Sequence, residues 1–149
     1  MDDNDFGGSV TTEVRLTEHY YDEFHKRKGV LFDDTDAIEV YKATQELQQN
    51  WPKCATDDNT PPEVGMNNGL YYIKFKFQSI GRAQLRICFG VLTNKSGNVE
   101  IVALTCRTKQ ELSGGSKDGT VAWYKHMDTV GKARWNQYRR GLLKNWKIY

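Results

Sequence analysis

The amino-acid sequence predicts an α+β domain, with an antiparallel β-sheet of about four strands, two N-terminal helices packed on one sheet face, and a C-terminal helix. Two observations support this class. Helical spacing of apolar residues is found mainly before residue 52, whereas apolar–polar alternation runs through residues 70–107. Helices that precede a run of strands are typical of α+β folds, in which the helices collect on one face of the sheet.

The chain begins with an acidic, glycine-rich stretch, residues 1–10, which we expect to be a disordered tail. The next segment, TTEVRLT at residues 11–17, alternates well enough to predict a short strand. Thr17 then provides an N-cap, acidic residues follow in the first turn and basic residues in the last, and Gly29 ends the pattern. We therefore expect a short helix between Thr17 and Gly29.

A second, longer helix begins at Asp34 or Thr35, either of which can act as its N-cap, and ends before Pro52. Apolar side chains recur at helical spacing along it. The face that we expect to be buried comprises Ile38, Tyr41, Thr44, Leu47 and Trp51. Residues 53–69 are rich in Pro, Asn, Asp and Gly, and this composition predicts a long loop.

Three strands follow, at residues 70–78, 82–92 and 99–107, separated by short turns. The third is apolar on both faces, which predicts that it is the central strand. A flexible loop is expected at residues 113–119. The chain ends in a basic helical stretch, residues 129–146. Its apolar stripe is expected to comprise Trp135, Tyr138, Leu142 and Trp146.

The alternation divides each predicted strand between two faces. One face of the first two strands is apolar, with Tyr71, Ile73, Phe75, Phe77, Leu85, Ile87, Phe89 and Val91. In the third strand, the residues expected to share a face are Val99, Ile101, Ala103, Thr105 and Arg107. The opposite side of the hairpin is basic, and we expect the helices to leave it open. The predicted concave platform comprises Tyr72, Lys74, Lys76 and Arg86, with Arg107 at its lip.

The length of 149 residues, 38% of them hydrophobic, is sufficient for a buried core, and we expect a single domain over residues 11–149. Three cysteines, Cys54, Cys88 and Cys106, cannot all pair with one another, and their spacing does not suggest a zinc site. No apolar run is long enough to span a membrane, and the first residues do not resemble a signal peptide. These features predict a cytoplasmic protein with no membrane partner.

Charge is distributed unevenly along the chain. Residues 1–63 carry 15 acidic and 6 basic side chains, a balance of −9, whereas residues 64–149 carry 4 acidic and 15 basic ones, a balance of +11. Such an asymmetry indicates a polyanionic partner for the basic half. Mutual attraction between the two halves within the fold is the alternative explanation.

The segments YIKFKF, GRAQLRICFGVL and VEIVALTCRTKQEL, together with the order of the predicted elements, resemble the RelE/HigB superfamily of bacterial toxins. That family includes HigB-like proteins of phage and mobile-element origin. The shared pattern is a Lys-X-Lys strand, a Gly-Arg turn into an apolar strand, and a last strand that ends in a basic cluster. It covers residues 69–112, with looser agreement over residues 11–51. The resemblance implies a RelE-like fold, ribosome-dependent cleavage of mRNA, and a cognate antitoxin as protein partner.

By this resemblance, Lys74 and Lys76 match the paired lysines of the family, and Arg107 matches the arginine at the end of its last strand. Either Arg82 or Arg86 matches the hairpin arginine. Many members carry an aromatic or histidine general base after the last arginine, and the segment TKQELSGGSK offers no counterpart. Tyr124 and His126 could fold back from the next segment to supply one.

Cleavage of RNA without a cofactor requires deprotonation of a 2′-hydroxyl, stabilisation of the charge on the phosphate, and protonation of the leaving 5′-oxygen. We assign Lys74 or Lys76 as the base or as an electrostatic catalyst, because cations on a rigid strand stabilise developing phosphate charge. Arg86 and Arg107 are the predicted phosphate clamps, since a guanidinium group matches two phosphate oxygens. The further residues predicted to bind RNA are Tyr72, Arg82, Lys109, Arg139 and Arg140.

Three alternatives stay open. Alternating lysines on a strand also occur as a solvated face or a protected sheet edge. The basic face would equally suit a non-catalytic nucleic-acid-binding protein, whose affinity falls steeply with salt. It would also suit an inhibitor that docks on an acidic protein, a class that includes the gyrase-inhibiting ParE branch of the same superfamily. The missing base after Arg107 favours the last two, whereas the Lys-X-Lys pair favours RNA cleavage.

Overall fold

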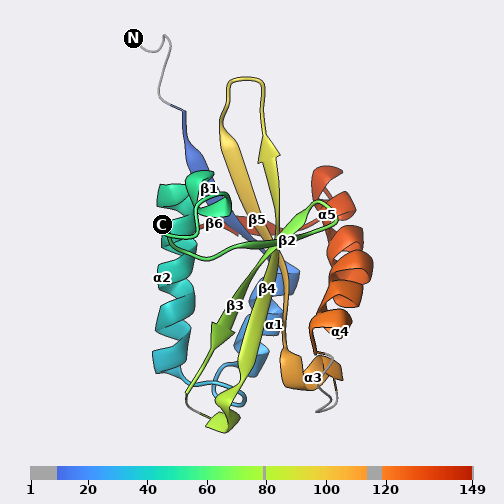
Figure 1. Cartoon of the computed structure of the whole chain (residues 1–149). Helices are drawn as coiled ribbons and strands as arrows, with labels where there is room; N and C mark the ends of the chain where they lie inside the picture. The colour runs from blue at the N-terminus through green and yellow to red at the C-terminus, as the bar shows by residue number, and fades with distance from the viewer. Residues whose placement is uncertain (1–9, 79, 114–118, 149) are drawn as a thin grey trace.

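The computed structural model describes residues 10–78, 80–113 and 119–148 (Figure 1). The predicted acidic tail lies outside the described residues except for Val10. Most of the loop predicted at residues 113–119 lies outside them as well.

A mixed sheet of six strands, counted over the described residues, forms the centre of the molecule in the order β2-β3-β4-β5-β1-β6. Its strands are β1 (Thr12–Thr17), β2 (Gly65–Asn67), β3 (Leu70–Lys76), β4 (Gln84–Thr93), β5 (Val99–Thr108) and β6 (Asn145–Lys147). The predicted antiparallel meander is present as β3, β4 and β5, but β1 runs parallel to β5. The prediction of about four antiparallel strands is therefore only partly correct. The edge strands β2 and β6 have three residues each, too few to show alternation in the sequence.

Helices α1 (Glu18–Arg27) and α2 (Asp34–Asn50) cover one face of the sheet, as the sequence predicts. The Thr17 hydroxyl accepts a hydrogen bond from the Tyr20 amide and caps α1. Asp33, one residue before the expected position, caps α2: its carboxylate accepts from the Asp36 amide, and its own amide donates to the Asp36 carboxylate, which makes a capping box.

The buried face of α2 differs from the predicted one. Leu47 is buried as expected, but Ile38 and Tyr41 are 62% and 45% exposed. The other residues that face the core are Ala37, Val40 and Ala43. Small side chains at this contact let the helix lie close to the sheet, and the larger Ile38 and Tyr41 are turned outward as a result.

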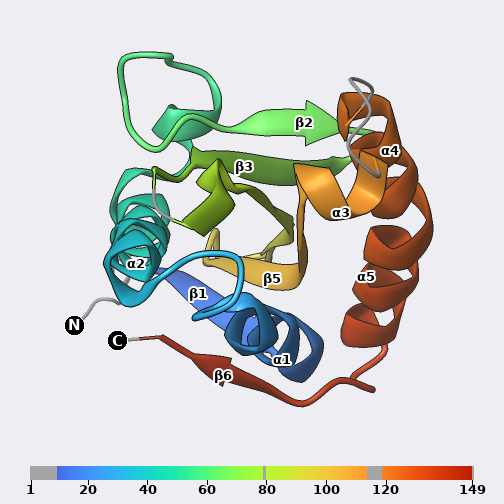
Figure 2. The same ribbon diagram turned by 90° about the horizontal axis from the view of Figure 1, so that it is seen from below.

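The second sheet face is covered, contrary to the predicted open platform. Three helices lie there, α3 (Lys109–Ser113), α4 (Gly119–His126) and α5 (Lys132–Arg139), with a π-helical turn at Met127–Gly131 between the last two. Figures 1 and 2 show this layer on the side of the sheet opposite α2. Its buried residues Trp123, Met127 and Trp135 pack against Leu70, Cys88, Val102 and Leu104 of the sheet. That side of the sheet is thus apolar at its centre, and this helical layer removes it from water.

The predicted C-terminal helix, residues 129–146, ends early. Gly141 adopts a positive φ of 73°, and its amide donates to the Tyr138 carbonyl while the Leu142 amide donates to that of Gln137. This hydrogen-bond pattern is a Schellman motif, which ends a helix at a glycine. Leu142 and Trp146 therefore do not continue the apolar stripe of Trp135, and Trp146 lies instead on β6.

A β-bulge in β5 corrects the predicted face of its last residues. The register between β4 and β5 shifts at Cys88/Phe89, so that Phe89 faces Ala103 whereas Cys88 faces Thr105. Beyond the bulge the alternation is reversed. Thr105 and Arg107 consequently lie on the α4 side of the sheet, and not on the α2 side with Ile101.

Candidate functional site

Three predicted basic residues occupy one row across the sheet. Lys74 of β3 faces Arg86 of β4, and Arg86 faces Arg107 of β5. Directly opposed residues of antiparallel strands project from the same face. The bulge in β5 brings Arg107 into this row, because without it the side chain would lie on the α2 side of the sheet.

Helix α4 crosses this row and buries its middle member. Arg86 is only 4% exposed, and its guanidinium donates to the Gly119 carbonyl at 3.0 Å and to the Thr120 hydroxyl at 3.4 Å. Burial lowers the pKa of Arg86, while its Nε has no hydrogen-bond partner among the described residues. In this structure Arg86 holds the first turn of α4, and it is not accessible as the predicted phosphate clamp.

On the β5 side of α4, two arginines converge on one carboxylate. The Nη1 atoms of Arg107 and Arg134 both lie 2.8 Å from Oε2 of Glu23, a residue of α1. Oε1 of Glu23 accepts from the Thr105 hydroxyl at 2.8 Å and from the Cys106 amide at 3.2 Å. Burial alone would raise the pKa of Glu23, but the bonds from Arg107 and Thr105 and the Arg134 charge outweigh it, and the pKa is lowered.

His126 completes this cluster from the last turn of α4. Its Nε2 lies 2.8 Å from the Thr105 hydroxyl, and its ring stacks on that of Trp123. Thr105 donates its one proton to Glu23, so His126 must donate to Thr105 through Nε2–H, which leaves the lone pair on Nδ1. Burial, followed by the positive charge of Arg107, lowers the pKa of His126 to about 4. The imidazole is therefore neutral at pH 7. We call Glu23, Thr105, Arg107, His126 and Arg134 the β5-edge cluster.

On the β3 side of α4, Lys74 and Lys76 are exposed as predicted. Beside Lys74, the hydroxyls of Tyr72 and Tyr124 lie 3.0 Å apart, and burial together with the Tyr124 hydroxyl raises the pKa of Tyr72 to about 12. A cavity of about 110 Å³ next to them is lined in part by Glu63 and Lys74. The two ends of the basic row are thus separated by α4 and do not form one continuous platform.

Of the other residues predicted to bind RNA, Lys109 begins α3 and Arg139 ends α5, and these two helices lie at opposite ends of their layer (Figure 1). Arg82 and Lys109 are near the β3–β4 turn, where the Gln110 side chain donates to the Arg82 carbonyl. Arg139 and Arg140 are exposed at the far end of α5, and the Arg139 guanidinium lies 5.9 Å from the Trp135 ring centre. The structure does not bring these four residues to a common surface.

Sequence reasoning missed Glu23, Thr105 and Arg134. In the sequence, Glu23 resembles an ordinary solvated residue of an acidic helix. It pairs with arginines only because the tertiary fold places α1 beside β5. Strand β1 pairs with β5 no further than Ala103, and α1 continues from β1 alongside the remaining edge of β5. Glu23 is thereby placed where it can accept the free Cys106 amide. The segment that carries Tyr124 and His126 does fold back onto the sheet. His126 reaches Thr105, and Tyr124 reaches Tyr72.

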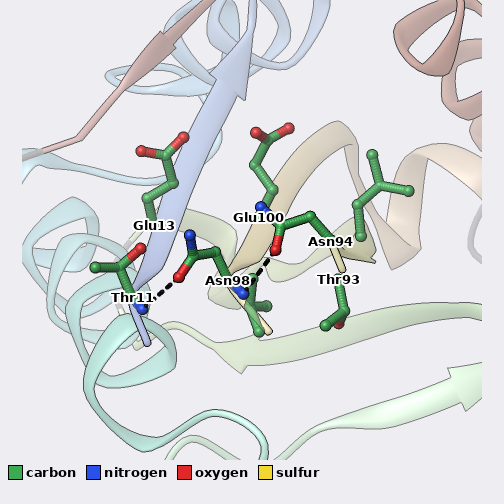
Figure 3. A pocket seen from close by; sticks show the side chains of 8 residues that line it. Thr11, Glu13, Thr93, Asn94, Asn98 and Glu100 are labelled. Carbon is green, nitrogen blue, oxygen red and sulfur yellow. Dashed lines mark hydrogen bonds between the residues drawn. The ribbon is translucent and has the colours of Figure 1, made fainter. Parts of the chain in front are cut away.

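A cavity of about 420 Å³ lies remote from these residues, at the start of β1 and the β4–β5 turn. Figure 3 shows its polar lining, in which the Asn98 side chain accepts from the Thr11 amide and the Asn94 side chain accepts from the Asn98 amide. Its carboxylates are engaged: Glu13 pairs with Arg15 at 2.9 Å, and Glu100 accepts a hydrogen bond from the Tyr138 hydroxyl. We assign no ligand to it.

Cys54, Cys88 and Cys106 are free and buried, and burial raises the pKa of each thiol, that of Cys88 to about 12. They are packing residues, as expected for inert cysteines. None of the helices in the described part of the chain is long and apolar enough to cross a membrane.

Comparison with known proteins gives no match: no family model, no curated protein and no solved structure corresponds to this chain.

Proposed function

We propose that this chain is an RNA-cleaving toxin of the RelE/HigB type, which cuts mRNA on the ribosome by attack of a 2′-hydroxyl on the adjacent phosphate. The observation that carries the proposal is the β5-edge cluster, in which two guanidinium groups contact the Glu23 carboxylate and a neutral imidazole is linked to it through the Thr105 hydroxyl. The resemblance in the Lys-X-Lys and Gly-Arg segments supports the same class. An antitoxin that binds this chain would be its protein partner.

Arginine supplies the electrostatic part of the proposed reaction. Arg107 and Arg134 have side chains that are 23% and 16% exposed, and each contacts Glu23 through Nη1. No hydrogen bond within the described residues uses their Nε or Nη2 atoms, so these remain for phosphate oxygens. Two fixed cations beside the reacting phosphate would stabilise the additional negative charge of the transition state.

His126 is the proposed acid–base group. Its Nδ1 takes the proton of the 2′-hydroxyl, the 2′-oxygen bonds to phosphorus, and the bond from phosphorus to the 5′-oxygen breaks. The 5′-oxygen then takes up the proton that the imidazolium releases, which yields a 2′,3′-cyclic phosphate and a 5′-hydroxyl end. Thr105 and Glu23 fix the tautomer and orientation of the ring through the Nε2–H bond.

The remaining predicted residues receive supporting roles. The exposed Lys74 and Lys76 would bind the RNA backbone on the other side of α4. Arg86 would act as a positioning residue, because its bonds to Gly119 and Thr120 hold the start of the helix that carries His126.

The test adds purified protein to a translating cell extract and maps the mRNA ends by primer extension. We expect ribosome-dependent cuts with the unchanged protein and with His19→Asn, a matched control on the exposed side of α1. His126→Asn should reduce the cutting rate by about 10²-fold or more, as loss of a general base does. Arg107→Ala should have an effect of similar size, and Lys74→Ala/Lys76→Ala a smaller one. An intact message with the unchanged protein would contradict the proposal.

One observation favours a non-catalytic RNA-binding protein as the second candidate. Glu23 already pairs with both arginines of the β5-edge cluster, and this pairing could serve only to join α1, β5 and α5. In that case the protein would bind RNA with a steep salt dependence through Lys74 and Lys76, and no new ends would appear.

A further inference from the structure

We propose that the β5-edge cluster binds a tetrahedral oxyanion and a proton together, the anion on Arg107 and Arg134 and the proton on Nδ1 of His126. The ligand is a sulfate or phosphate group, which a free ion or the phosphodiester of RNA can supply. The inference deepens the proposed function and rests on its assignment of the two arginines as phosphate ligands. It adds a control step, because the bound anion itself makes His126 ready to hold a proton.

The cluster carries more positive than negative charge. Its carboxylate, Glu23, lies 2.8 Å from the guanidinium groups of both Arg107 and Arg134. The next basic residue, Arg27, is already paired with Glu111 at 2.6 Å. One positive charge of the cluster therefore has no counter-ion among the described residues. A partly buried charge without a counter-ion favours the binding of an anion.

The donors that remain free on the two arginines suit an oxyanion. Nη1 of Arg107 binds both Glu23 and the Cys106 carbonyl, the latter at 2.7 Å. Nη1 of Arg134 binds both Glu23 and the Leu104 carbonyl, the latter at 3.1 Å. The Nε and Nη2 donors share the other edge of each guanidinium group and make no hydrogen bond within the described part of the chain. Such an edge can hold two oxygens of one sulfate or phosphate group.

The hydrogen bonds of His126 determine where the proton is added. Its Nε2–H donates to the Thr105 hydroxyl at 2.8 Å, and this hydroxyl donates to Glu23 at 2.8 Å. The imidazole also stacks on the Trp123 ring, with ring centres 5.6 Å apart. These contacts hold the ring in one orientation, and a second proton can be added only at Nδ1.

The surroundings of His126 oppose this proton in the free protein. The charged groups that act on it, from β5, α1 and α5, are Arg107, Glu23, Arg27 and Arg134. Arg86 of β4 bonds to Gly119, at the opposite end of α4. Burial and the Arg107 charge hold the pKa of His126 at about 4. An anion on the arginines would offset their charge, and an opposite charge within about 4–6 Å raises the pKa of a base by about 1 to 3.

The experiment titrates the full chain with sulfate and follows the ¹⁵N signals of its histidine rings by NMR. Sulfate is a suitable probe because it keeps its double negative charge from pH 7.5 to pH 5. At saturating sulfate, the pKa of His126 should rise from about 4 by about 1 or more, and Nδ1 should be the nitrogen that takes the proton. His25, which lies between α1 and α2, should not respond.

The affinity for sulfate is a second, independent measurement. Because binding of the anion and of the proton favour each other equally, the affinity should be about twofold to fivefold higher at pH 5 than at pH 7.5. Glu23 stays ionised over this range, since its pKa is lowered from the ordinary value of 4.5. In His126→Asn the affinity should be the same at both pH values.

Two variants with the same change of charge test whether the arginines hold the anion. Arg134→Gln should weaken sulfate binding by about fivefold or more, because it removes one of the two guanidinium groups. Lys125→Gln removes a charge from an exposed position on α4 and should change the affinity by less than about twofold. Circular dichroism checks the fold of both variants, and the titration of the unchanged protein depends on neither.

A deoxyribose dinucleotide, which lacks the 2′-hydroxyl and cannot be cut, tests the phosphodiester as the source of the anion. An equal rise in the pKa of His126 with sulfate and with the dinucleotide supports the inference and the proposed function together. A rise with sulfate alone supports the inference for free ions and counts against RNA cleavage.

Two results would overturn the inference. One is sulfate binding that leaves the titration of His126 unchanged, which would indicate an adventitious ion only. The other is the absence of sulfate binding up to about 50 mM. Ribosome-dependent cuts in mRNA together with either result would retain the proposed function and exclude the coupling between anion and proton.

Discussion

The two faces of the sheet are stabilised in different ways. On the α1–α2 side the buried residues are almost all apolar, with aromatic contacts such as Phe24–Phe32 and Phe32–Phe77. On the α4–α5 side, Trp123 and Met127 share the buried layer with the guanidinium of Arg86, and the β5-edge cluster lies at its margin.

The apolar side therefore contributes mainly to stability, whereas the side with buried charged groups mainly fixes the position of particular side chains. Apolar burial is favourable in proportion to the area removed from water and tolerates many arrangements. Buried charged groups gain little net free energy, since desolvation offsets their attraction, but they are costly to leave unpaired. The α1–α2 side should therefore tolerate conservative changes, whereas the α4–α5 side should respond sharply when one polar partner is removed.

The largest expected effects come from truncating a buried ring on either side. Trp123→Ala and Phe24→Ala should each lower the free energy of unfolding by about 3–5 kcal/mol, because both rings are almost fully buried. Urea denaturation monitored by circular dichroism measures the loss. A cost below about 1 kcal/mol for Trp123→Ala would mean that α4 does not close the second face.

Next comes the carboxylate of the β5-edge cluster. Glu23→Gln should lower the free energy of unfolding by about 2–4 kcal/mol, because Arg107 and Arg134 lose their shared counter-charge. Glu18→Gln, an exposed position on the same helix, is the matched control and should stay within about 0.5 kcal/mol. Urea titrations measure both variants. Equal losses of unfolding free energy would show that the β5-edge cluster is no more sensitive to a lost charge than an exposed position.

Acid should weaken the α4–α5 side before the other. His126 has a pKa of about 4 in the folded protein and 6.5 as its ordinary value, so the unfolded chain binds more protons between these pH values. Stability is therefore complete above pH 6.5 and falls as the pH drops toward 4. The expected loss is about 1–2 kcal/mol, after allowance for solvent at the partly exposed ring.

Urea titrations at pH 7.5, 6, 5 and 4.5 measure this loss, with His126→Asn as the comparison. The variant should lose most of the pH dependence between pH 6.5 and 5. Below that range Glu23 adds a second acid-sensitive contribution, since its lowered pKa gives stability that disappears as the carboxylate is protonated. An unchanged profile in His126→Asn would show that the imidazole is not buried neutral.

The smallest expected effect tests the outer surface of α2. Ile38→Ser should change the free energy of unfolding by no more than about 0.5 kcal/mol, because Ile38 is 62% exposed and contributes little to the core. Thermal or urea denaturation is sufficient to measure it. A loss above about 1.5 kcal/mol would instead support the buried face that helical spacing alone predicts.

Local patterns predicted much of the fold. The alternation in β3 and β4 places Ile73 and Leu85 correctly on the buried face, and the Thr17 cap begins α1 where it was expected. The face of α2 was predicted incorrectly, because neighbouring apolar positions compete and the approach to the sheet favours Ala37 and Ala43. The covered second face was also missed, because Trp123 and Trp135 follow the strands in the sequence and no local pattern links them to Leu70 and Cys88.

The candidate site was predictable only in part. The sequence identified Lys74, Arg86 and Arg107 as a set, and the strand register does align them in one row. It could not reveal that Arg86 is buried under α4 or that Arg107 pairs with Glu23. Glu23 and Arg107 are 84 residues apart, and no periodic pattern links positions so distant.

By itself, the sequence determined the α+β class, the antiparallel meander and the Thr17 cap of α1, because these depend on interactions between residues close in the chain. Tertiary structure alone decided the parallel pairing of β1 with β5, the reversed face after the β5 bulge, and the neutral state of His126. Each of these depends on groups that are far apart in sequence and meet only when the chain is compact. Burial and charge at that meeting point then decide which side chains can bind, donate or accept a proton.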